Sequence, residues 1–233
     1  HSDTWFPMAP WDWCFEPGYW WFGYDYPWYP GWSQWVGCVR PLPWWWHRPS
    51  QPPEIVAEQQ VDIGPDGTVN IAIDTSTAKL AHPHLDHEYT ITAEVTDESR
   101  RTIVGTGKVL VARKPFRVFT WVDRGYYHVG DNIVANFMAQ TLDQQPVSGD
   151  AELTLNFVSY NAKREPIETP VRRWQLNVGE DGRARQSLRA SQPGQYRLSL
   201  SLTDESGHTI EGGYLFTITG EGFDGKDFRF NQI

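Results

Sequence analysis

The sequence predicts an all-β protein, built from tandem immunoglobulin- or fibronectin-like antiparallel β-sandwiches with an aromatic-rich irregular insert at the amino end. Short runs of alternating apolar and polar residues are separated by turns rich in Gly, Asp and Pro, and no segment carries a convincing helical period. A long stretch also occurs twice, as YTITAEVTDESRRTIVGTGKVLV from Tyr89 and as YRLSLSLTDESGHTIEGGYLFTI from Tyr196. The two observations together predict repeated sandwich domains.

The two stretches align without gaps and share the tyrosine, the TDES turn, the Thr-Ile pair and the glycine that follows it. A second pair, VDIGPDGTVNIAI from Val61 and LNVGEDGRARQSL from Leu176, repeats a G-x-D-G turn. The repeat distance of about 110 residues is far longer than a solenoid repeat and matches a small β-sandwich. This spacing predicts an array of domains.

Residues 1–53 form a segment of unusual composition. They hold eleven of the thirteen tryptophans, interleaved with tyrosine, proline and glycine, and they follow neither the strand period nor the helix period. A segment of this kind becomes ordered only by packing its rings on something else. We therefore expect an insert in the first sandwich, or a replacement for that sandwich's first half.

Residues 54–114 are predicted to be the carboxy-terminal half of a sandwich. Val61–Ile63 and Val69–Ile73 flank an Asp-Gly turn and are typical of a hairpin, since glycine accepts the positive φ of a tight turn. Residues 89–95 and 103–111 alternate in phase and are expected to be half-buried antiparallel strands. Nothing before them matches the opening strands of the second copy.

Residues 115–220 are predicted to be a complete sandwich of about seven strands. Its alternating runs begin near Phe116, Ile133, Leu153, Trp174, Tyr196 and Tyr214. Residues 221–233 are expected to be a linker followed by the first strand of a further domain. The sequence thus leads us to expect a parent protein that continues in both directions.

Length and charge limit the classes of function. A chain of 233 residues can hold two cores of ordinary size, and its net charge of -9 argues against nucleic-acid and anionic-membrane surfaces. No apolar run is long enough to cross a bilayer, and no charged-then-apolar leader opens the sequence. The expected partners are proteins.

The chain resembles the macroglobulin-like domains of α2-macroglobulins, in particular the bacterial forms, over roughly residues 53–233. The most specific element is a Tyr-x-x-Gly-Asp strand opening at Tyr127 to Asp131, followed by Pro-Val-x-Gly at Pro146 to Gly149. The resemblance implies a large periplasmic or secreted protein, with membrane anchoring, if any, through another part of the polypeptide. It implies that residues 54–114 and 115–220 are macroglobulin-like sandwiches.

Members of that family are broad-spectrum protease inhibitors that act in defence. A protease cuts a bait segment, the array closes around it, and in many members a buried Cys-Gln thioester acylates it. The resemblance implies that this chain is a structural part of such a trap. Its partners would be proteases, through the full-length protein, and neighbouring domains; no cofactor and no enzymatic activity are expected.

The two cysteines depart from the thioester pattern. A thioester needs Cys-x-x-Gln, whereas Cys14 and Cys38 begin CFEP and CVRP. In an exported protein a disulfide between them would close a loop of about 24 residues and contribute ~3 kcal/mol in the loop-entropy model. The alternative is two unpaired thiols buried among aromatic rings.

The aromatic segment admits three interpretations: a wedge filling space between sandwiches, a surface that binds a glycan or protein, and a membrane-interface contact. The candidate binding surface comprises Trp20, Trp21, Trp28, Trp32, Trp44, Trp45 and Trp46. The first place to search for exposed rings is Trp44 to Trp46, beside His47 and Arg48. On the second interpretation the chain is an exported binding module that holds a cell-wall glycan or a partner protein.

A histidine-rich stretch, HPHLDHEYT, contains His82, His84 and His87 together with Asp86 and Glu88. This spacing can place several imidazoles around a metal ion, but a solvated loop before a strand is favoured, and no metal is expected.

A basic loop is expected from Tyr160 to Arg173, with Lys163, Arg164 and Arg172 in it. It is interpreted as an ordinary hairpin connection that trypsin-like proteases would cut, because the family places its bait region elsewhere.

Motifs for catalysis are missing from the sequence. It contains no G-x-S-x-G elbow, no His-Glu-x-x-His and no phosphate loop. The paired carboxylates at Asp97-Glu98 and Asp204-Glu205 fall in turns, where side-chain oxygens cap backbone N–H groups.

Overall fold

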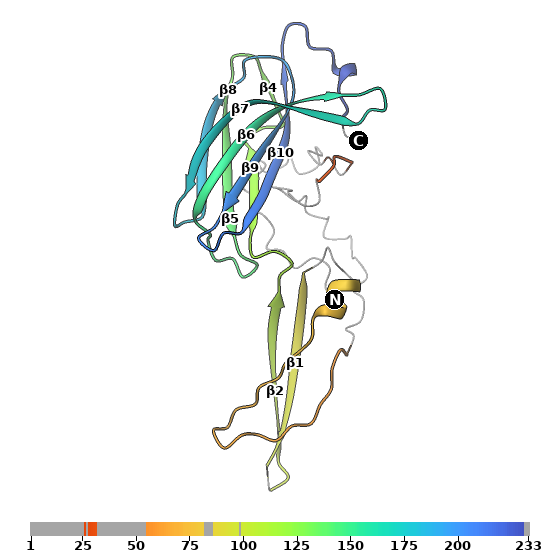
Figure 1. The fold of residues 1–233 in the computed structure, drawn as a ribbon, viewed down its shortest axis with the longest axis vertical. Helices are drawn as coiled ribbons and strands as arrows, with labels where there is room; N and C mark the ends of the chain where they lie inside the picture. Colours follow the sequence, from red (N-terminus) through yellow and green to blue (C-terminus); the bar gives the residue numbers. More distant parts are fainter. Residues whose placement is uncertain (1–25, 27, 32–54, 82–85, 98, 231–233) are drawn as a thin grey trace. The chain divides into compact units, whose positions relative to one another are not determined.

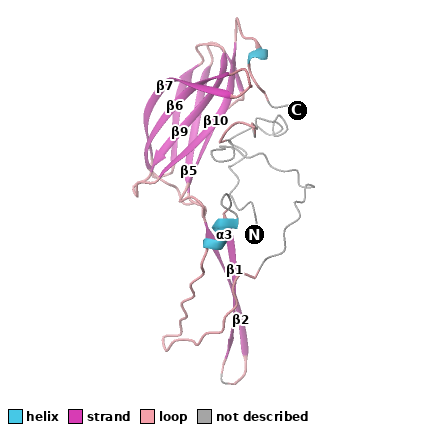
Figure 2. Ribbon diagram, turned by 45° about the vertical axis from the view of Figure 1, so that its right-hand side comes forward, coloured by secondary structure: helices cyan, strands magenta, loops and turns pink. Residues whose placement is uncertain are grey.

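The computed structural model describes residues 26, 28–31, 55–81, 86–97 and 99–230. The described residues up to 114, apart from 26 and 28–31, belong to one compact unit, and those two stretches with residues 115–230 belong to another. Among the residues that the structure describes, the regular elements of both units are strands, nearly all of them antiparallel, apart from a short α-helix and a 3-10 turn (Figures 1 and 2). The predicted all-β sandwich class is confirmed.

In its described part, the first unit contains one long hairpin. Strand β1, His87–Thr96, pairs antiparallel with β2, Thr102–Val111, so that Tyr89 lies opposite Val109. The expected half-burial is wrong for most of this hairpin, since only its base is partly covered and the rest is exposed. Within the described residues no further strand pairs with either edge, and no second layer covers the apolar side chains.

The hairpin predicted at Val61–Ile63 and Val69–Ile73 is present only as its turn. Gly64 N donates to the Thr68 carbonyl over 3.0 Å and Gly67 N to the Gly64 carbonyl over 2.9 Å, but the flanking residues are not strands. Extended segments become strands only when a neighbour accepts their backbone hydrogen bonds. The Asp-Gly signal therefore predicted the turn correctly, but the flanking residues do not form the strands that were expected.

A short helix, α3, spans Ser76–Ala81 and was not predicted. The Asp74 Oδ1 atom accepts a hydrogen bond from Ser76 N over 2.8 Å at its start. Six residues are too few to display a helical period in the sequence. This helix is also far too short to span a bilayer, and none of the described helices could do so.

The second unit is a two-layer sandwich (Figure 1). One sheet has the order β4-β10-β9-β6-β7 and the other β3-β5-β8. The strands of the first sheet are β4 Tyr126–His128, β6 Gly149–Tyr160, β7 Pro166–Val178, β9 Gly194–Thr203 and β10 Thr209–Thr219. Those of the second are β3 Arg117–Val122, β5 Asn132–Gln140 and β8 Arg183–Arg189.

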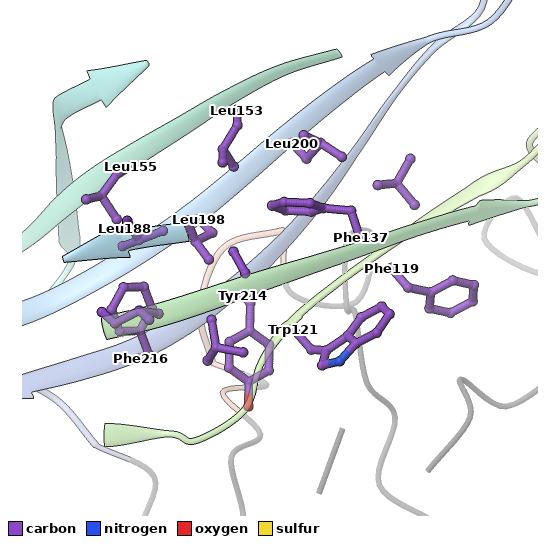
Figure 3. Packing of buried hydrophobic residues seen from close by; sticks show 14 of the residues in the cluster. Phe119, Trp121, Phe137, Leu153, Leu155, Leu188, Leu198, Leu200, Tyr214 and Phe216 are labelled. Carbon is purple, nitrogen blue, oxygen red and sulfur yellow. The ribbon is translucent and has the colours of Figure 1, made fainter. Parts of the chain in front are cut away.

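The core lies between these two sheets. Figure 3 shows Leu153 of β6, Leu200 of β9 and Phe137 of β5 close to one another, and all three are almost wholly buried. Their strands alternate as the sequence predicts, with apolar residues inside and polar residues outside. Burial of these side chains is the main stabilising term of the unit.

The motif that carries the family resemblance forms a compact corner. Tyr127 is fully buried on β4, which pairs in parallel with the end of β10, and its hydroxyl donates to Asp123. Asp131 Oδ2 accepts from His128 N over 3.0 Å and closes the turn that leads into β5. The Tyr-x-x-Gly-Asp spacing therefore joins the two sheets.

The sequence repeat is also a repeat of structure. In the β1–β2 turn, Asp97 Oδ1 accepts from Arg101 N at 2.9 Å, and in the β9–β10 turn Asp204 Oδ1 accepts from His208 N at 2.7 Å. Tyr196 lies opposite Phe216 just as Tyr89 lies opposite Val109. The two hairpins thus share turn chemistry and strand register.

Candidate functional site

A second, smaller apolar cluster lies on the face of the five-stranded sheet that points away from the core. Val158 of β6 and Leu215 of β10 are both fully buried there, on the strand faces opposite to the main core. Outer faces of sandwich sheets are normally polar. Two covered apolar residues on such a face indicate that another segment of the protein is packed against it.

That segment belongs to the tryptophan-rich region. Residues 26 and 28–31, the aromatic anchor, place the Tyr26 and Tyr29 rings over Val158 and Leu215. Tyr29 N donates to the Tyr26 carbonyl over 2.8 Å, and this turn brings both rings to the sheet. The Trp28 ring packs edge-on against Tyr26, with ring centroids 5.9 Å apart. The anchor is held by ring contacts and not by strand pairing.

An ionic group, the Arg197 cluster, borders the anchor and consists of Arg197, Glu168, Glu211 and Tyr29. Arg197 Nε and Nη2 donate to the two oxygens of Glu168 over 2.7 and 2.8 Å, and Nη1 donates to Glu211 Oε1 over 2.7 Å. The Tyr29 hydroxyl donates to Glu168 Oε1 over 2.7 Å. The cluster therefore ties the anchor to strands β7, β9 and β10.

Protonation states in this cluster follow from burial and pairing. Burial lowers the pKa of Arg197, but the hydrogen bonds to Glu168 and Glu211 outweigh it and raise the pKa above its ordinary value. Burial, followed by the hydrogen bond to Glu168, raises the pKa of Tyr29 far above the usual range. At neutral pH the cluster thus contains a charged guanidinium and a neutral phenol.

The tail, residues 220–230, reaches the same face. The Arg229 guanidinium stacks on the Trp28 ring with its carbon 4.1 Å from the ring centroid, and Gln195 Nε2 donates to the Arg229 carbonyl over 3.2 Å. Arg164, at the tip of the β6–β7 hairpin, donates to the carbonyls of Lys226 and Phe228, each over 3.1 Å. The tail and the anchor thus meet through Arg229 and Trp28.

The chemistry of this site is that of a structural joint. Each charged group of the Arg197 cluster has an oppositely charged partner at hydrogen-bonding distance, and the phenol of Tyr29 donates its proton to a carboxylate. Polar groups that satisfy one another rigidify a site. The contacts hold the anchor and the tail, which are distant in the sequence, on the same sheet.

Sequence reasoning missed this joint. One signal was available in β6, where the adjacent apolar residues Phe157 and Val158 depart from strict alternation; Asn156 and Val158 are buried and Phe157 is partly buried. An arginine at a strand centre, Arg197, was a second signal, because arginine is rarely buried unless paired.

Most of the predicted site residues lie outside the described residues: Cys14, Cys38, Trp20, Trp21, Trp32, Trp44, Trp45 and Trp46. Of the candidate binding surface, Trp28 is described. Its ring is partly buried between Tyr26, Tyr29, Tyr160 and Arg229. At this one position the ring is used for packing within the molecule.

The histidine-rich stretch is described in part. His82 and His84 lie outside the described residues, whereas His87 and Asp86 are buried and Asp86 Oδ1 accepts from Arg113 N over 2.7 Å. Glu88 pairs with Lys108 across the hairpin at 2.9 Å. Over the described ranges no three potential ligands come together as a metal site would require.

The basic loop expected from Tyr160 to Arg173 is much shorter than predicted. Strand β6 ends at Tyr160 and β7 begins at Pro166, so Arg172 and Arg173 lie within a strand. Asn161 N donates to the Glu165 carbonyl over 3.0 Å and closes the turn. The prediction relied on the four basic residues of this stretch, but charged side chains are accommodated on the exposed part of β7. The two prolines of β7 are tolerated because it lies at the end of the strand order.

Comparison with known proteins gives a limited result. No family model and no curated protein matches the chain. Among solved structures, the sporulation control protein Spo0M from Bacillus subtilis is 9% identical with a TM-score of 0.33, and covers 46% of this chain and 50% of its own. This chain thus spans about half the length of that relative.

Two further structures are similar at the same level. A CARDB domain from Pyrococcus furiosus, solved in complex with di-metal ions, is 9% identical with a TM-score of 0.29 and covers 45% of this chain and 87% of its own. The soluble domain of PmoD from Methylocystis is 13% identical with a TM-score of 0.27, over 45% of this chain and 90% of its own. Similarity this low carries no argument about function.

Proposed function

We propose that this chain is a structural module of a macroglobulin-like, protease-trapping protein. The observation that carries the proposal is the joint on the five-stranded sheet, where the anchor and the tail are fixed by Val158, Leu215 and the Arg197 cluster. A trap built from many sandwiches needs modules that hold neighbouring segments in place. The Tyr-x-x-Gly-Asp corner, which carries the sequence resemblance, supports the same assignment.

The physical character of the joint favours a scaffold over a ligand-binding platform. A sugar-binding surface needs ring faces open to solvent, but one face of Trp28 is stacked with Arg229 and Tyr160 is a further ring neighbour. The Arg197 side chain is occupied by two carboxylates. Trp28 and Arg197 therefore both make their contacts within the chain.

The test uses the full-length protein that contains this chain. It is incubated with several proteases, with and without methylamine, and the remaining activity is measured on casein and on a small peptide substrate. A trapped protease loses activity on casein and keeps it on the small peptide, because only the small substrate reaches it. Covalent adducts with the protease on a denaturing gel that methylamine prevents would show that the full-length protein also contains a thioester.

Equal activity on both substrates would overturn the proposal. To connect the outcome to this chain, the same assay is run on Arg197→Ala, which breaks the joint, and on Arg173→Ala, an exposed arginine on β7. Trapping should fall with Arg197→Ala and remain with Arg173→Ala.

A further inference from the structure

The tail is held by side chains that bind its main chain. Arg164 donates to the carbonyls of Lys226 and Phe228, and Gln195 Nε2 donates to the following carbonyl, that of Arg229. Figure 1 shows the tip of the β6–β7 hairpin, which carries Arg164, beside the tail. In peptide recognition, main-chain hydrogen bonds give affinity and side-chain contacts give specificity. The tail therefore lies on the sheet as a bound peptide does.

Gln195 is a buried donor that is already oriented for this contact. Its side chain is fully buried, and the Tyr160 hydroxyl donates to Oε1, which leaves Nε2 for the Arg229 carbonyl. Burial raises the pKa of Tyr160 to about 12, so its hydroxyl keeps the donated proton at neutral pH. A buried amide without an acceptor is unfavourable. This position therefore requires a carbonyl from the segment that covers it.

Two side chains of the tail give the contact its chemical character. The Phe228 ring lies edge-on to Phe157 of β6, with ring centroids 6.4 Å apart. The next residue, Arg229, places its guanidinium over Trp28. The elements on the sheet thus accept an aromatic ring and a cation from two successive residues.

The tail itself is lightly attached. None of residues 220–230 is buried, and none of them belongs to a strand. Its 3-10 turn, η1, Gly225–Asp227, is closed by local bonds, since Lys226 N donates to Asp224 Oδ1 over 3.0 Å. The Phe223 and Phe228 rings stack within the tail, with centroids 5.4 Å apart. A segment with few buried contacts opens at low cost, and this one keeps its local contacts when it does.

We propose that Arg164, Gln195, Phe157 and Trp28 form a peptide-binding site, and that its ligand is a segment in which a Phe-Arg pair follows a tight turn. The tail is the ligand that this chain supplies to itself, and it competes with the same peptide from another molecule. Because the tail is covalently attached, its effective concentration is on the order of millimolar, so the site is masked until the tail is weakened. This inference does not depend on protease trapping.

The experiment measures the binding of a labelled peptide to the 233-residue chain by fluorescence anisotropy. The peptide is EGFDGKDFRF, the sequence of residues 221–230, and the control peptide, EGFDGKDRFF, exchanges the Phe-Arg pair. The tail-weakened chain carries Phe228→Ala and Arg229→Ala. It should bind the first peptide about tenfold or more tightly than the wild-type chain does, because its own tail competes less. The control peptide should bind weakly to both chains.

Arg164→Gly, added to the tail-weakened chain, tests whether this site binds the peptide. Glycine suits the φ of 63° at position 164, and it occupies the equivalent position of two other turns, at Gly182 and Gly207, so the hairpin should persist. Loss of both guanidinium bonds should weaken peptide binding about tenfold. Lys163→Ala removes the neighbouring charge at the same hairpin tip and is the matched control, which should leave binding unchanged.

Four outcomes would overturn the proposal: no binding to the tail-weakened chain, equal binding of the two peptides, equal affinity of the wild-type and tail-weakened chains, or unchanged binding after Arg164→Gly. Two sources offer this ligand, the tail of a second copy and a similar segment of another protein. An unlabelled chain with Arg164→Gly alone has an intact tail and a weakened site, and it serves as competitor. Displacement of the peptide assigns the ligand to a second copy, and lack of displacement assigns it to another protein.

Discussion

Arg197 and Glu168 form a two-bond fork across a strand that lies between them. Arg197 is on β9 and Glu168 on β7, and β6 separates the two in the sheet. The third guanidinium bond, to Glu211, reaches β10 on the other side. One side chain therefore connects strands across most of the sheet, independently of the backbone ladder.

Replacement of Arg197 by alanine should lower the free energy of unfolding by roughly 2–4 kcal/mol, because it leaves two carboxylates without their shared cation. The measurement is urea denaturation followed by circular dichroism. Arg173→Ala, on the same sheet, is the control and should change stability by less than about 0.5 kcal/mol. Equal effects of the two variants would mean that the fork contributes no more than a surface charge.

The phenol of Tyr29 predicts an alkaline dependence of stability. Its folded pKa is raised above the unfolded value of about 10, so its stabilising contribution is complete below pH ~10 and is lost as the pH rises above that value. Tyr29→Phe removes the contribution. The stability difference between the wild-type protein and Tyr29→Phe should therefore shrink above pH ~10 in a series of urea titrations, while a constant difference would contradict the assignment.

Two turn glycines in the second unit should respond differently to alanine. A Cβ at Gly182, whose φ is +70°, would lie 2.4 Å from the Ala139 carbonyl oxygen, whereas a Cβ at Gly207, whose φ is +83°, would meet nothing within 4 Å. Gly207→Ala should cost about 1 kcal/mol for the backbone conformation alone, and Gly182→Ala roughly 2–4 kcal/mol. Thermal denaturation of both variants measures the two losses of stability. Similar losses would show that the structure around Gly182 shifts easily to accommodate the added Cβ.

The contact between Arg229 and Trp28 should control attachment of the tail. Arg229→Ala removes the stacked guanidinium, which contributes ~1 kcal/mol, and should speed hydrogen exchange across residues 223–230. Lys226→Ala is the matched control, because Arg164 binds the main-chain carbonyl of residue 226 and not its side chain. Unchanged exchange in Arg229→Ala would show that the other tail contacts suffice.

The sandwich of the second unit could be predicted because its strands obey the local rule of alternation. Leu198, Leu200 and Leu202 alternate with polar residues and are fully buried, and their turn is marked by Asp204 and Gly207. The information for these elements lies within each strand. The order of the strands in each sheet could not be predicted in this way, because it depends on contacts between strands that are far apart in the sequence.

The same rule was less successful for the first unit, where residues 61–63 and 69–73 carry a strand signal but form no strand with any described residue. The joint was also outside the reach of pattern reasoning, because it depends on contacts between residues such as Tyr29 and Glu168 that are remote in the sequence. Burial of Arg197 follows from two acidic residues on other strands. Such tertiary contacts override local propensity.

The hold of Arg164 on the tail has a consequence for how freely this region can change during evolution. Its two acceptors are the main-chain carbonyls of Lys226 and Phe228, and every amino acid offers the same carbonyl. Substitutions at position 226 can therefore accumulate without weakening the hydrogen bonds from Arg164, provided that the number of residues in the tail stays the same. A single inserted or deleted residue between 220 and 228 would shift both carbonyls out of reach, so selection in this segment should act on spacing before identity.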